Sequence, residues 1–389
     1  MNILFCYRNW LNPQKGGVPR ISDTLAKYFV SEGHVVYYLT YQNYQKDDYQ
    51  FPAKIYTLPD PVFFSKRNQE YYHKLLHELS INLMINHDSS NERARFFLNT
   101  GKHPAKKISL YHTDPLNGLY KTSELSGGFR LFLYRIFPDI LQYVKTQRKK
   151  KEINYLLENS DRLVFLSEEF KKQVSAELRI NTSKIQAINN PCFSYNFLNT
   201  SRKKKQILFV ARIDYLVKRP DKMLNIWSCL QNEHPDWELI FLGDGPDRMK
   251  VENLAKSMNL KNVRFEGIVD PVPYYKEASI ICMTSDYEGF GLALLEGMQF
   301  GVIPIAFNNW ISLKDLIVDM VTGIIVPTDD ILQYVEKLNM LMSDENIRIM
   351  MSYKAIDQAK KFGIERIGPK WIKLDRKSTR LNSSHVALS

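Results

Sequence analysis

Asp286-Tyr287-Glu288-Gly289-Phe290-Gly291-Leu292-Ala293-Leu294-Leu295-Glu296-Gly297-Met298 is the stretch that decides the fold prediction for this chain. It follows a short apolar run, residues 279–283, which has the length and composition of a buried β-strand. A strand, a glycine-containing turn and then a helix form the unit with which α/β proteins present backbone N–H groups to a phosphate. Gly289 and Gly291 lack a Cβ, so the backbone there can bend sharply and approach a ligand.

Two carboxylates bracket this turn. Glu288 lies in the turn, and Glu296 is expected about two turns into the helix. They can therefore hold different parts of one extended ligand whose phosphates lie between them. The alternative is a solvent-facing helix with two acids of no function, because a two-residue pattern recurs by chance. The preceding strand, the Glu-Gly-Phe-Gly core and the strand expected at 301–305 favour the functional interpretation.

Strand-like and helix-like runs alternate along almost the whole chain, which predicts parallel sheets covered by helices. In the first half we expect strands at 2–7, 35–40, 54–58, 81–87, 107–112, 162–166 and 184–189. Gly16-Gly17 lies between the first strand and a helix at 18–31, at the sheet edge where open α/β proteins bind ligands. Two adjacent glycines are also a common simple turn.

A histidine ends each of two neighbouring strands in this half. His112 lies where the strand at 107–112 gives way to a loop, and His87 ends the strand before it. Such a histidine can face a ligand, or it can be a loop residue that is hydrogen-bonded to backbone. Both interpretations remain open for His112, and His87 is the rival candidate.

The second half restarts the pattern with a strand at 206–211, followed directly by Arg212 and Lys218. Two cations at the carboxyl end of a strand can stabilise the charge that grows on a departing diphosphate. The alternative is an exposed basic loop. The next strand, at 237–242, ends in Gly243-Asp244-Gly245-Pro246, where the glycines permit a tight turn and proline suits the first turn of a helix.

These motifs resemble those of retaining glycosyltransferases of family four, which have the GT-B architecture: two Rossmann-like domains that face each other across a cleft. The resemblance implies that Glu288 contacts the donor sugar and Glu296 the nucleotide ribose. It implies that Arg212 and Lys218 hold the donor diphosphate. This chain has Arg219 where the family has a glycine after the lysine, which leaves open whether Lys218 or Arg219 makes the contact.

The resemblance extends to several further positions. In the first half it implies that His112 faces the donor sugar and that Gly16 and Gly17 lie near the diphosphate and the acceptor. In the second half it implies that the remaining donor-binding positions are Gly243, Gly245, Gly289, Phe290 and Gly291.

The implied reaction moves a hexosyl group from a nucleotide-sugar donor, UDP- or GDP-linked, to a saccharide or lipid-linked acceptor with retention of anomeric configuration, in bacterial surface polysaccharide and cell wall biosynthesis. The nucleotide sugar is a substrate, so no cofactor is expected. No Asp-x-Asp occurs in the chain, so a bound metal is not implied. The alternatives are a GT-B enzyme of other chemistry, such as a phosphorylase or a nucleotide-sugar epimerase, and a non-enzymatic basic protein that binds membrane or nucleic acid.

The formal net charge of +11 implies anionic partners. Region 129–151 combines a helical apolar pattern, interrupted at Pro138, with a basic cluster at 145–151. It can lie on an anionic membrane surface, or it can be a core-packed helix with a solvated basic end. The lysine-rich stretch 199–205 is interpreted as a linker and not as a nucleic-acid site, because no aromatic residues alternate with its charges.

Length and composition predict two domains. With 389 residues, 44% of them hydrophobic, the chain can bury two cores. We expect an acceptor-side domain at 1–200 and a donor-side domain at 201–375, whose last helix crosses back to the first domain. Residues 376–389 resemble translated adaptor read-through and are set aside from the fold prediction.

The chain shows no apolar run of about 18 residues and begins directly with a strand-like segment, which predicts neither a transmembrane helix nor a signal peptide. We therefore expect a cytoplasmic location that includes the inner face of the cell membrane. The four cysteines are scattered without a Cys-x-x-Cys pair, which does not favour a zinc site.

Overall fold

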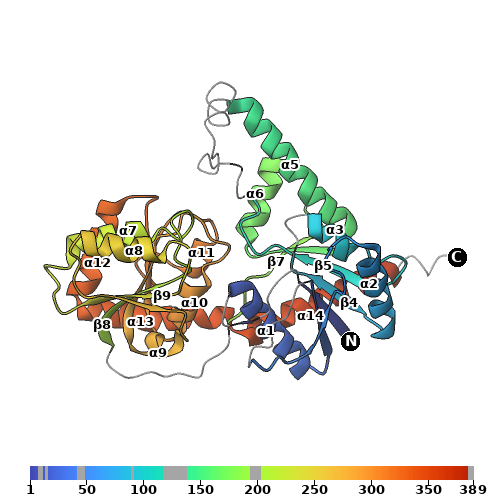
Figure 1. Ribbon diagram of the computed structural model, residues 1–389, viewed down its shortest axis with the longest axis horizontal. Coiled ribbons are helices and arrows are strands. Elements are labelled where there is room, and N and C mark those ends of the chain that lie inside the picture. The colour runs from blue at the N-terminus through green and yellow to red at the C-terminus, as the bar shows by residue number, and fades with distance from the viewer. Residues whose placement is uncertain are drawn as a thin grey trace. The chain divides into compact units, whose positions relative to one another are not determined.

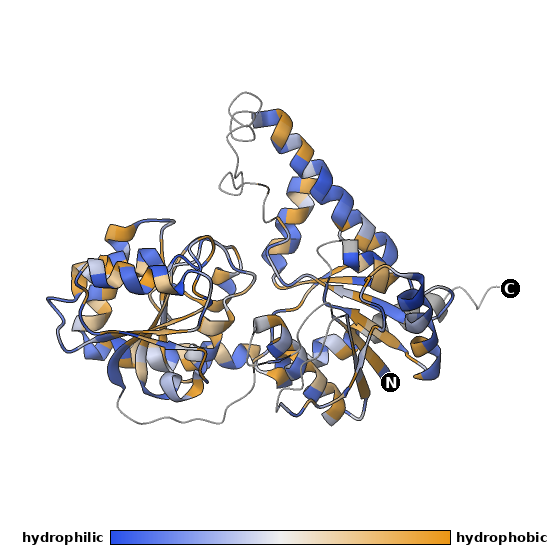
Figure 2. Cartoon of the chain, in the orientation of Figure 1, coloured by the Kyte–Doolittle hydropathy of each residue, from blue (hydrophilic) through white to orange (hydrophobic). Residues whose placement is uncertain are grey.

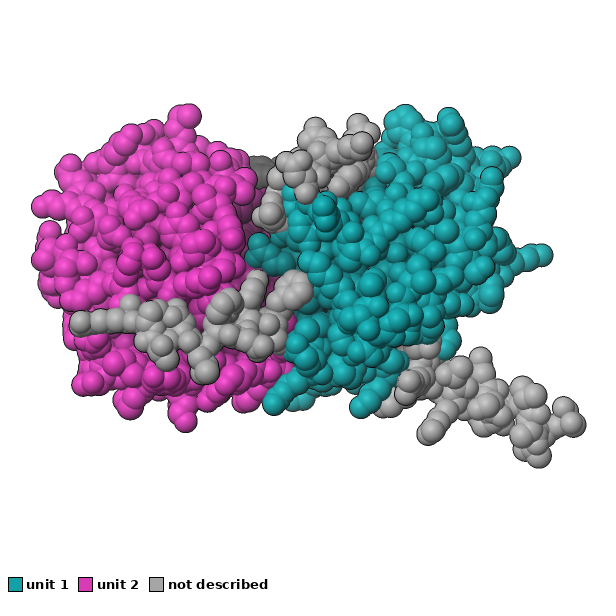
Figure 3. Space-filling view, turned by 90° about the horizontal axis from the view of Figure 1, so that it is seen from below, with its two compact units in different colours: residues 1–191, 364–389 teal, residues 192–363 magenta. Residues whose placement is uncertain are grey.

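The computed structural model describes residues 1–7, 12–13, 16–41, 49–88, 92–116, 119, 138–192 and 203–383. The chain forms two compact units, which Figure 3 distinguishes by colour. Unit 1 comprises 1–191 and 364–389, and unit 2 comprises 192–363. We expected the second domain to span residues 201–375, whereas unit 2 begins at Cys192 and ends at Gly363. The last helix belongs to unit 1.

Unit 1 contains a seven-stranded parallel sheet with the order β3-β2-β1-β4-β5-β6-β7. Its strands are β1 (Asn2–Cys6), β2 (Val35–Thr40), β3 (Lys54–Thr57), β4 (Leu83–Asn86), β5 (Lys106–Leu110), β6 (Arg162–Phe165) and β7 (Ile185–Ala187). The expected strands differ from these only at their ends. Central strands such as β4 are buried along their whole length, as expected for a parallel sheet that helices cover on both faces.

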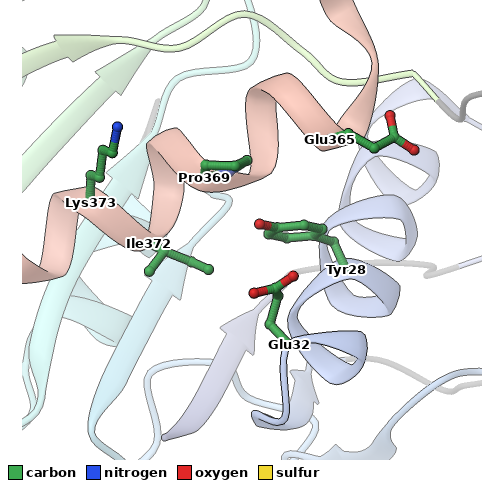
Figure 4. Close-up of a pocket in the computed structure, with 6 residues that line it drawn as sticks. All are labelled: Tyr28, Glu32, Glu365, Pro369, Ile372 and Lys373. Carbon is green, nitrogen blue, oxygen red and sulfur yellow. The ribbon is translucent and has the colours of Figure 1, made fainter.

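The helices of unit 1 are α1 (Gly17–Ser31), α2 (Lys66–Glu78), α3 (Glu92–Leu98), α5 (Pro138–Asn159), α6 (Glu168–Leu178) and α14 (Ile364–Ser383) (Figure 1). Helix α14 packs on α1, where Gly368 lies so close to the ring of Tyr28 that a side chain at Gly368 would overlap it. A pocket between the two helices is lined by Tyr28, Glu32, Glu365, Pro369, Ile372 and Lys373 (Figure 4). Of the residues set aside as read-through, 376–383 continue α14, and 384–389 lie outside the described residues.

Unit 2 contains a six-stranded parallel sheet with the order β10-β9-β8-β11-β12-β13. The strands are β8 (Lys204–Val210), β9 (Glu238–Leu242), β10 (Val263–Gly267), β11 (Ala278–Met283), β12 (Ile303–Phe307) and β13 (Ile324–Val326). The helices are α7 (Pro220–Leu230), α8 (Arg248–Ser257), α9 (Val272–Glu277), α10 (Leu292–Gln299), α11 (Leu313–Leu316), α12 (Ile331–Ser343) and α13 (Glu345–Ala359). The strands of both sheets are mostly apolar (orange in Figure 2), and in unit 2 they form one core with the helices.

Each sheet reverses its strand order once. In unit 1 the chain passes from β1 outward to β3 and then starts again on the other side of β1 with β4. In unit 2 the same reversal separates β8 from β11. Open α/β sheets bind ligands at the carboxyl ends of the two strands that flank such a switch point. This topology therefore places the loops after β1 and β4, and those after β8 and β11, at the two candidate binding edges.

The predicted class is confirmed, because both units are parallel α/β sheets of the Rossmann type. In the part of the chain that the structure describes, none of the helices combines the length and apolar character needed to cross a membrane.

Candidate active site

Lys218 and Glu288 meet at the switch point of unit 2. The Nζ atom of Lys218, in the loop after β8, donates to Oε1 of Glu288, in the loop after β11, at 2.6 Å. Their side chains are only 20% and 13% exposed. The hydroxyl of Ser285 donates to the same carboxylate oxygen at 2.7 Å. A partly buried ion pair is screened less than one in open solvent, so this contact holds the carboxylate in one orientation.

Arg212 follows β8 directly and is fixed by Asp214. The guanidinium donates from Nε to Oδ2 of Asp214 at 2.8 Å, and it is 65% exposed while the carboxylate is 6% exposed. The other oxygen of Asp214 accepts the backbone N–H of Val217 at 2.7 Å and that of Lys218 at 3.3 Å. Asp214 thus shapes the loop that presents both predicted cations. The sequence analysis missed this residue, and its signal was an acid two positions after Arg212.

Gly243 and Gly245 lie against the backbone that carries Arg212. A Cβ at Gly243 would overlap the carbonyl oxygen of Ala211, and one at Gly245 would overlap that of Ile213. The N–H of Ala211 donates to the carbonyl of Leu242 at 3.1 Å. Gly243 also has φ +136°, a conformation that side chains disfavour. The structure therefore gives these two glycines a packing role, since only glycine permits this close approach of the two loops.

The turn before α10 has the expected strand-turn-helix form. Gly291 has φ +86° and is the N-cap residue of α10, so the free N–H groups of the first helical turn follow directly after the Gly289-Phe290-Gly291 turn. The Phe290 ring is buried and packs edge-on against Phe362 with ring centroids 5.6 Å apart. Its side chain therefore belongs to the core, and its backbone is the part that a ligand can contact.

Glu296 lies on α10, where its Oε2 accepts the hydroxyl of Tyr275 at 3.2 Å. The tyrosine hydroxyl restrains the carboxylate, which is partly exposed. Glu288 and Glu296 are thus held by different neighbours, in keeping with two separate contacts to one ligand.

Arg219 is occupied by other acids. It has φ +52°, which explains why a glycine suits this position, and it donates to Asp221 at 2.8 Å and to Asp286 at 3.4 Å. The hydrogen bonds with Asp221 raise the pKa of Arg219. Lys222, which is nearly buried, also contacts Asp286, at 2.7 Å, and Asp329. Of the two cations that the sequence left open, Lys218 is therefore the one that contacts Glu288.

The predicted residues of unit 1 gather at its own switch point. Gly16 and Gly17 lie at the N-terminus of α1, after β1. His112 and His87, the two rival candidates, are hydrogen-bonded to each other, with 2.9 Å between Nε2 of His112 and Nδ1 of His87. Burial lowers the pKa of His112 to about 3, and burial with the nearby His112 lowers that of His87 well below its usual value. Both rings are therefore neutral near pH 7.

Within the described residues, no group of three or more His, Cys, Asp or Glu side chains has the arrangement of a metal site. None of the four cysteines forms a disulfide bond: Cys6, Cys192 and Cys282 are buried and Cys229 is exposed.

Solved structures share the fold of this chain. A variant of S. aureus TarM in complex with fondaparinux, alpha-GlcNAc-glycerol and UDP superposes with a TM-score of 0.78 at 14% identity, over 96% of this chain and 99% of that one. Anabaena HepE in complex with UDP and glucose superposes with a TM-score of 0.75 at 13% identity, over 97% and 100%. The chain has the GT-B fold of these two proteins.

Residues 195–358 match the family model described as glycosyl transferases group 1. A Haemophilus influenzae protein named an uncharacterized glycosyltransferase is 30% identical over 218 residues, 54% of this chain and 60% of the relative. The GalNAc-alpha-(1->4)-GalNAc-alpha-(1->3)-diNAcBac-PP-undecaprenol alpha-1,4-N-acetyl-D-galactosaminyltransferase of Campylobacter jejuni is 32% identical over 196 residues, 49% of this chain and 54% of the relative. The chain thus spans little more than half the length of these relatives. The residues that match this family model lie within unit 2.

Proposed function

We propose that this protein is a retaining, metal-independent glycosyltransferase that moves a hexosyl group from a UDP- or GDP-linked donor to a saccharide or lipid-linked acceptor, in the synthesis of a bacterial surface polysaccharide or of the cell wall. The observation that carries the proposal is the Lys218–Glu288 pair at the switch point of unit 2, together with Arg212 in the loop that carries Lys218. Glu288, an acid that can bind sugar hydroxyls, contacts Lys218, and the loop that carries Lys218 also carries Arg212, so this loop offers two cations that can bind a diphosphate.

In the proposed reaction, the bond between the anomeric carbon and the diphosphate oxygen breaks, and its electron pair leaves with the nucleotide. Arg212, Lys218 and the N-terminus of α10 stabilise the charge that grows on that oxygen. The acceptor oxygen forms the new bond on the same face of the sugar, and its proton passes to the departing phosphate. Glu288 orients the donor sugar through its hydroxyls, and Glu296 binds the ribose.

From unit 1, His112 and the Gly16-Gly17 turn contribute to substrate binding, as the family resemblance implies. The comparisons support the general kinds of substrate: UDP is bound in the TarM and HepE complexes, and the name of the Campylobacter jejuni relative specifies an undecaprenol-linked acceptor.

A lipid-linked acceptor requires contact with a membrane, and α5 offers a surface for it. Of region 129–151, residues 129–137 lie outside the described residues. Ile140 and Tyr143 are 60% and 64% exposed, and they share a helical stripe with Val144 and Lys151. This stripe is opposite to the buried Ile153.

Basic residues flank the apolar stripe of α5. Arg148 and Lys151 are exposed and Lys150 is partly exposed. Lys149 is only 16% exposed, because its Nζ donates to Tyr111 and Glu152, so it belongs to the fold and not to this surface. Apolar and basic residues together suit an anionic lipid surface. We place the enzyme in the cytoplasm, at the inner face of the cell membrane.

The membrane proposal is tested by sedimentation with vesicles that contain an anionic phospholipid. Replacing Arg148, Lys150 and Lys151 with Gln should release the protein. A charge-matched control replaces Lys66, Arg67 and Lys74 on α2, and it should still bind. Equal binding of both variants would refute a role for α5.

The proposed reaction is tested by a thermal-shift screen against UDP- and GDP-sugars, followed by transfer to saccharide acceptors with NMR assignment of the product anomer. We expect a product of the donor's anomeric configuration and unchanged turnover in excess EDTA. A strict manganese requirement would refute metal independence. Release of a sugar phosphate in the presence of free phosphate would identify a phosphorylase, and isomerisation of the donor without transfer would identify an epimerase. If calorimetry detects no nucleotide binding, the result would favour the alternative of a non-enzymatic basic protein that binds membrane or nucleic acid.

A further inference from the structure

Three neighbouring strands bring an aromatic stack together in unit 1. Strands β1, β4 and β5 are adjacent, and Tyr7, His87 and His112 follow their carboxyl ends. The His87 ring stacks on Tyr7, with centroids 4.5 Å apart and an interplanar angle of 15°, and it meets the nearly parallel ring of His112 edge to edge, with centroids 5.1 Å apart and an interplanar angle of 16°. His87 is nearly buried, at 7% exposure, whereas His112 is partly exposed.

Three groups surround the Nδ1 atom of His87. Nε2 of His112 lies at 2.9 Å, and the hydroxyl oxygens of Tyr7 and Ser22 each lie at 3.2 Å. Both hydroxyls donate their single hydrogen to the carbonyl of Val18, Ser22 at 3.0 Å and Tyr7 at 3.3 Å. Their oxygens therefore face His87 as acceptors, and an Nδ1 atom that is surrounded by acceptors carries the proton.

The surroundings of the other ring nitrogen of His87, Nε2, indicate the same tautomer. Among the residues that the structure describes, its Nε2 is buried without a hydrogen-bond partner. A neutral imidazole has one N–H, and an N–H on Nε2 would be a buried donor with nothing to accept it. With the proton on Nδ1, the N–H of His87 is directed to Nε2 of His112, which must then be the unprotonated nitrogen.

We propose that His87 is a positioning residue that holds His112 as its Nδ1–H tautomer, so that His112 meets its substrate as a hydrogen-bond donor to an oxygen atom and not as a base. This rests on the proposed function, in which His112 contacts substrate. It also agrees with a reaction in which the acceptor's proton passes to the departing phosphate. Burial keeps both rings neutral, so the tautomer, and not the charge, is what His87 determines.

The tautomer is read directly by NMR of protein labelled with ¹⁵N-histidine, with the His112 signals identified by their loss in His112→Gln. We expect the wild-type spectrum to show a protonated Nδ1 and a bare Nε2 for His112. In His87→Phe, which keeps a stacking ring but has no donor, we expect His112 to shift toward its Nε2–H form. A wild-type His112 protonated at Nε2, or an unchanged tautomer in His87→Phe, would overturn the proposal.

Kinetics test the consequence for catalysis. His87→Phe should lower kcat about 10- to 100-fold, because His112 is misoriented, with a much smaller change in KM. His87→Asn places an amide N–H near the position of Nδ1 and should recover most of this loss. His77→Phe is the matched control, since His77, on α2, also contacts a histidine ring, that of His103, in an edge-on arrangement. Unaltered kcat in a folded His87→Phe would overturn the positioning role.

The two proposals fail in different ways. If the protein transfers no sugar from any donor while the NMR spectrum still shows His112 protonated at Nδ1, the proposed function is wrong and the hydrogen-bond arrangement stands.

Discussion

The Nζ atom of Lys218 lies 2.6 Å from Oε1 of Glu288, although the two residues are 70 positions apart in the chain. The contact joins the loops after β8 and β11, which are neighbours in the sheet because the strand order reverses between them. The reversal leaves a crevice between these two loops at the carboxyl edge of the sheet, and the Lys218–Glu288 ion pair lies there. Arg212, held by Asp214, belongs to the same loop as Lys218.

Glu288→Gln should lower kcat/KM by a factor corresponding to about 2–4 kcal/mol, because a neutral amide binds sugar hydroxyls and Lys218 less strongly than a carboxylate does. The measurement is steady-state transfer with a saturating acceptor, alongside circular dichroism to confirm the fold. Glu336→Gln on α12 is the control, since Glu336 is 71% exposed and lies on another helix. Wild-type kinetics in Glu288→Gln would remove its assigned role.

Arg212→Ala should raise the barrier by about 2–4 kcal/mol, since it removes a charged contact to the departing diphosphate. Arg212→Lys should recover only part of this loss, because an ammonium cannot reproduce the planar contact with Asp214. Both variants are compared by kcat and by UDP affinity from calorimetry. If alanine and lysine gave equal activity, charge at this position would not contribute.

Arg219→Gly should retain activity, whereas Lys218→Ala should lose it. Glycine relieves the left-handed conformation at 219, which offsets the lost contacts with Asp221 and Asp286, so we expect a net stability change within about 1 kcal/mol. Urea unfolding and transfer assays on the two variants check this. A large activity loss in Arg219→Gly, with Lys218→Ala active, would reverse the assignment of the two cations.

Gly243→Ala should destabilise unit 2 by about 2–4 kcal/mol, because the new Cβ overlaps the carbonyl oxygen of Ala211 and must displace the loop that carries Arg212. Gly33→Ala is the control that separates backbone strain from steric overlap, because Gly33 also has positive φ but has open space around it. We expect this variant to lose about 1 kcal/mol of unfolding free energy. Chemical denaturation monitored by tryptophan fluorescence gives both values. Similar losses of unfolding free energy in the two variants would show that positive φ, and not steric overlap, causes the destabilisation.

Unit 1 should lose stability as pH falls from about 6.5 toward pH 3 through its two neutral histidines. The folded pKa of His112 is about 3 and that of His87 is well below 6.5, so in this window the unfolded chain binds more protons and stability rises with pH. The double variant His87→Phe, His112→Phe should show a flatter pH dependence than the wild type in urea titrations. Parallel curves would contradict the lowered pKa values.

The fold could be predicted from sequence because each unit is built from local signals. Buried parallel strands such as β11 are continuous apolar runs, and glycine turns mark where helices follow. The domain ends could not be predicted in this way. We expected the last helix to cross back to the first domain, and α14 does belong to unit 1, where Gly368 packs closely on Tyr28 of α1; the residue at which unit 2 ends, Gly363, was not evident from the sequence.

Of the site, the sequence by itself determined which chemical groups follow which strands: Arg212 and Lys218 after β8, Glu288 after β11 and His112 after β5. Tertiary structure alone decided which of these touch. It paired Glu288 with Lys218 and not with Arg219, it turned the Phe290 ring into the core, and it joined His87 to His112. The physical reason is that a residue's type and its nearest neighbours set local backbone conformation, whereas strand order sets which loops are adjacent, and strand order depends on packing between distant segments.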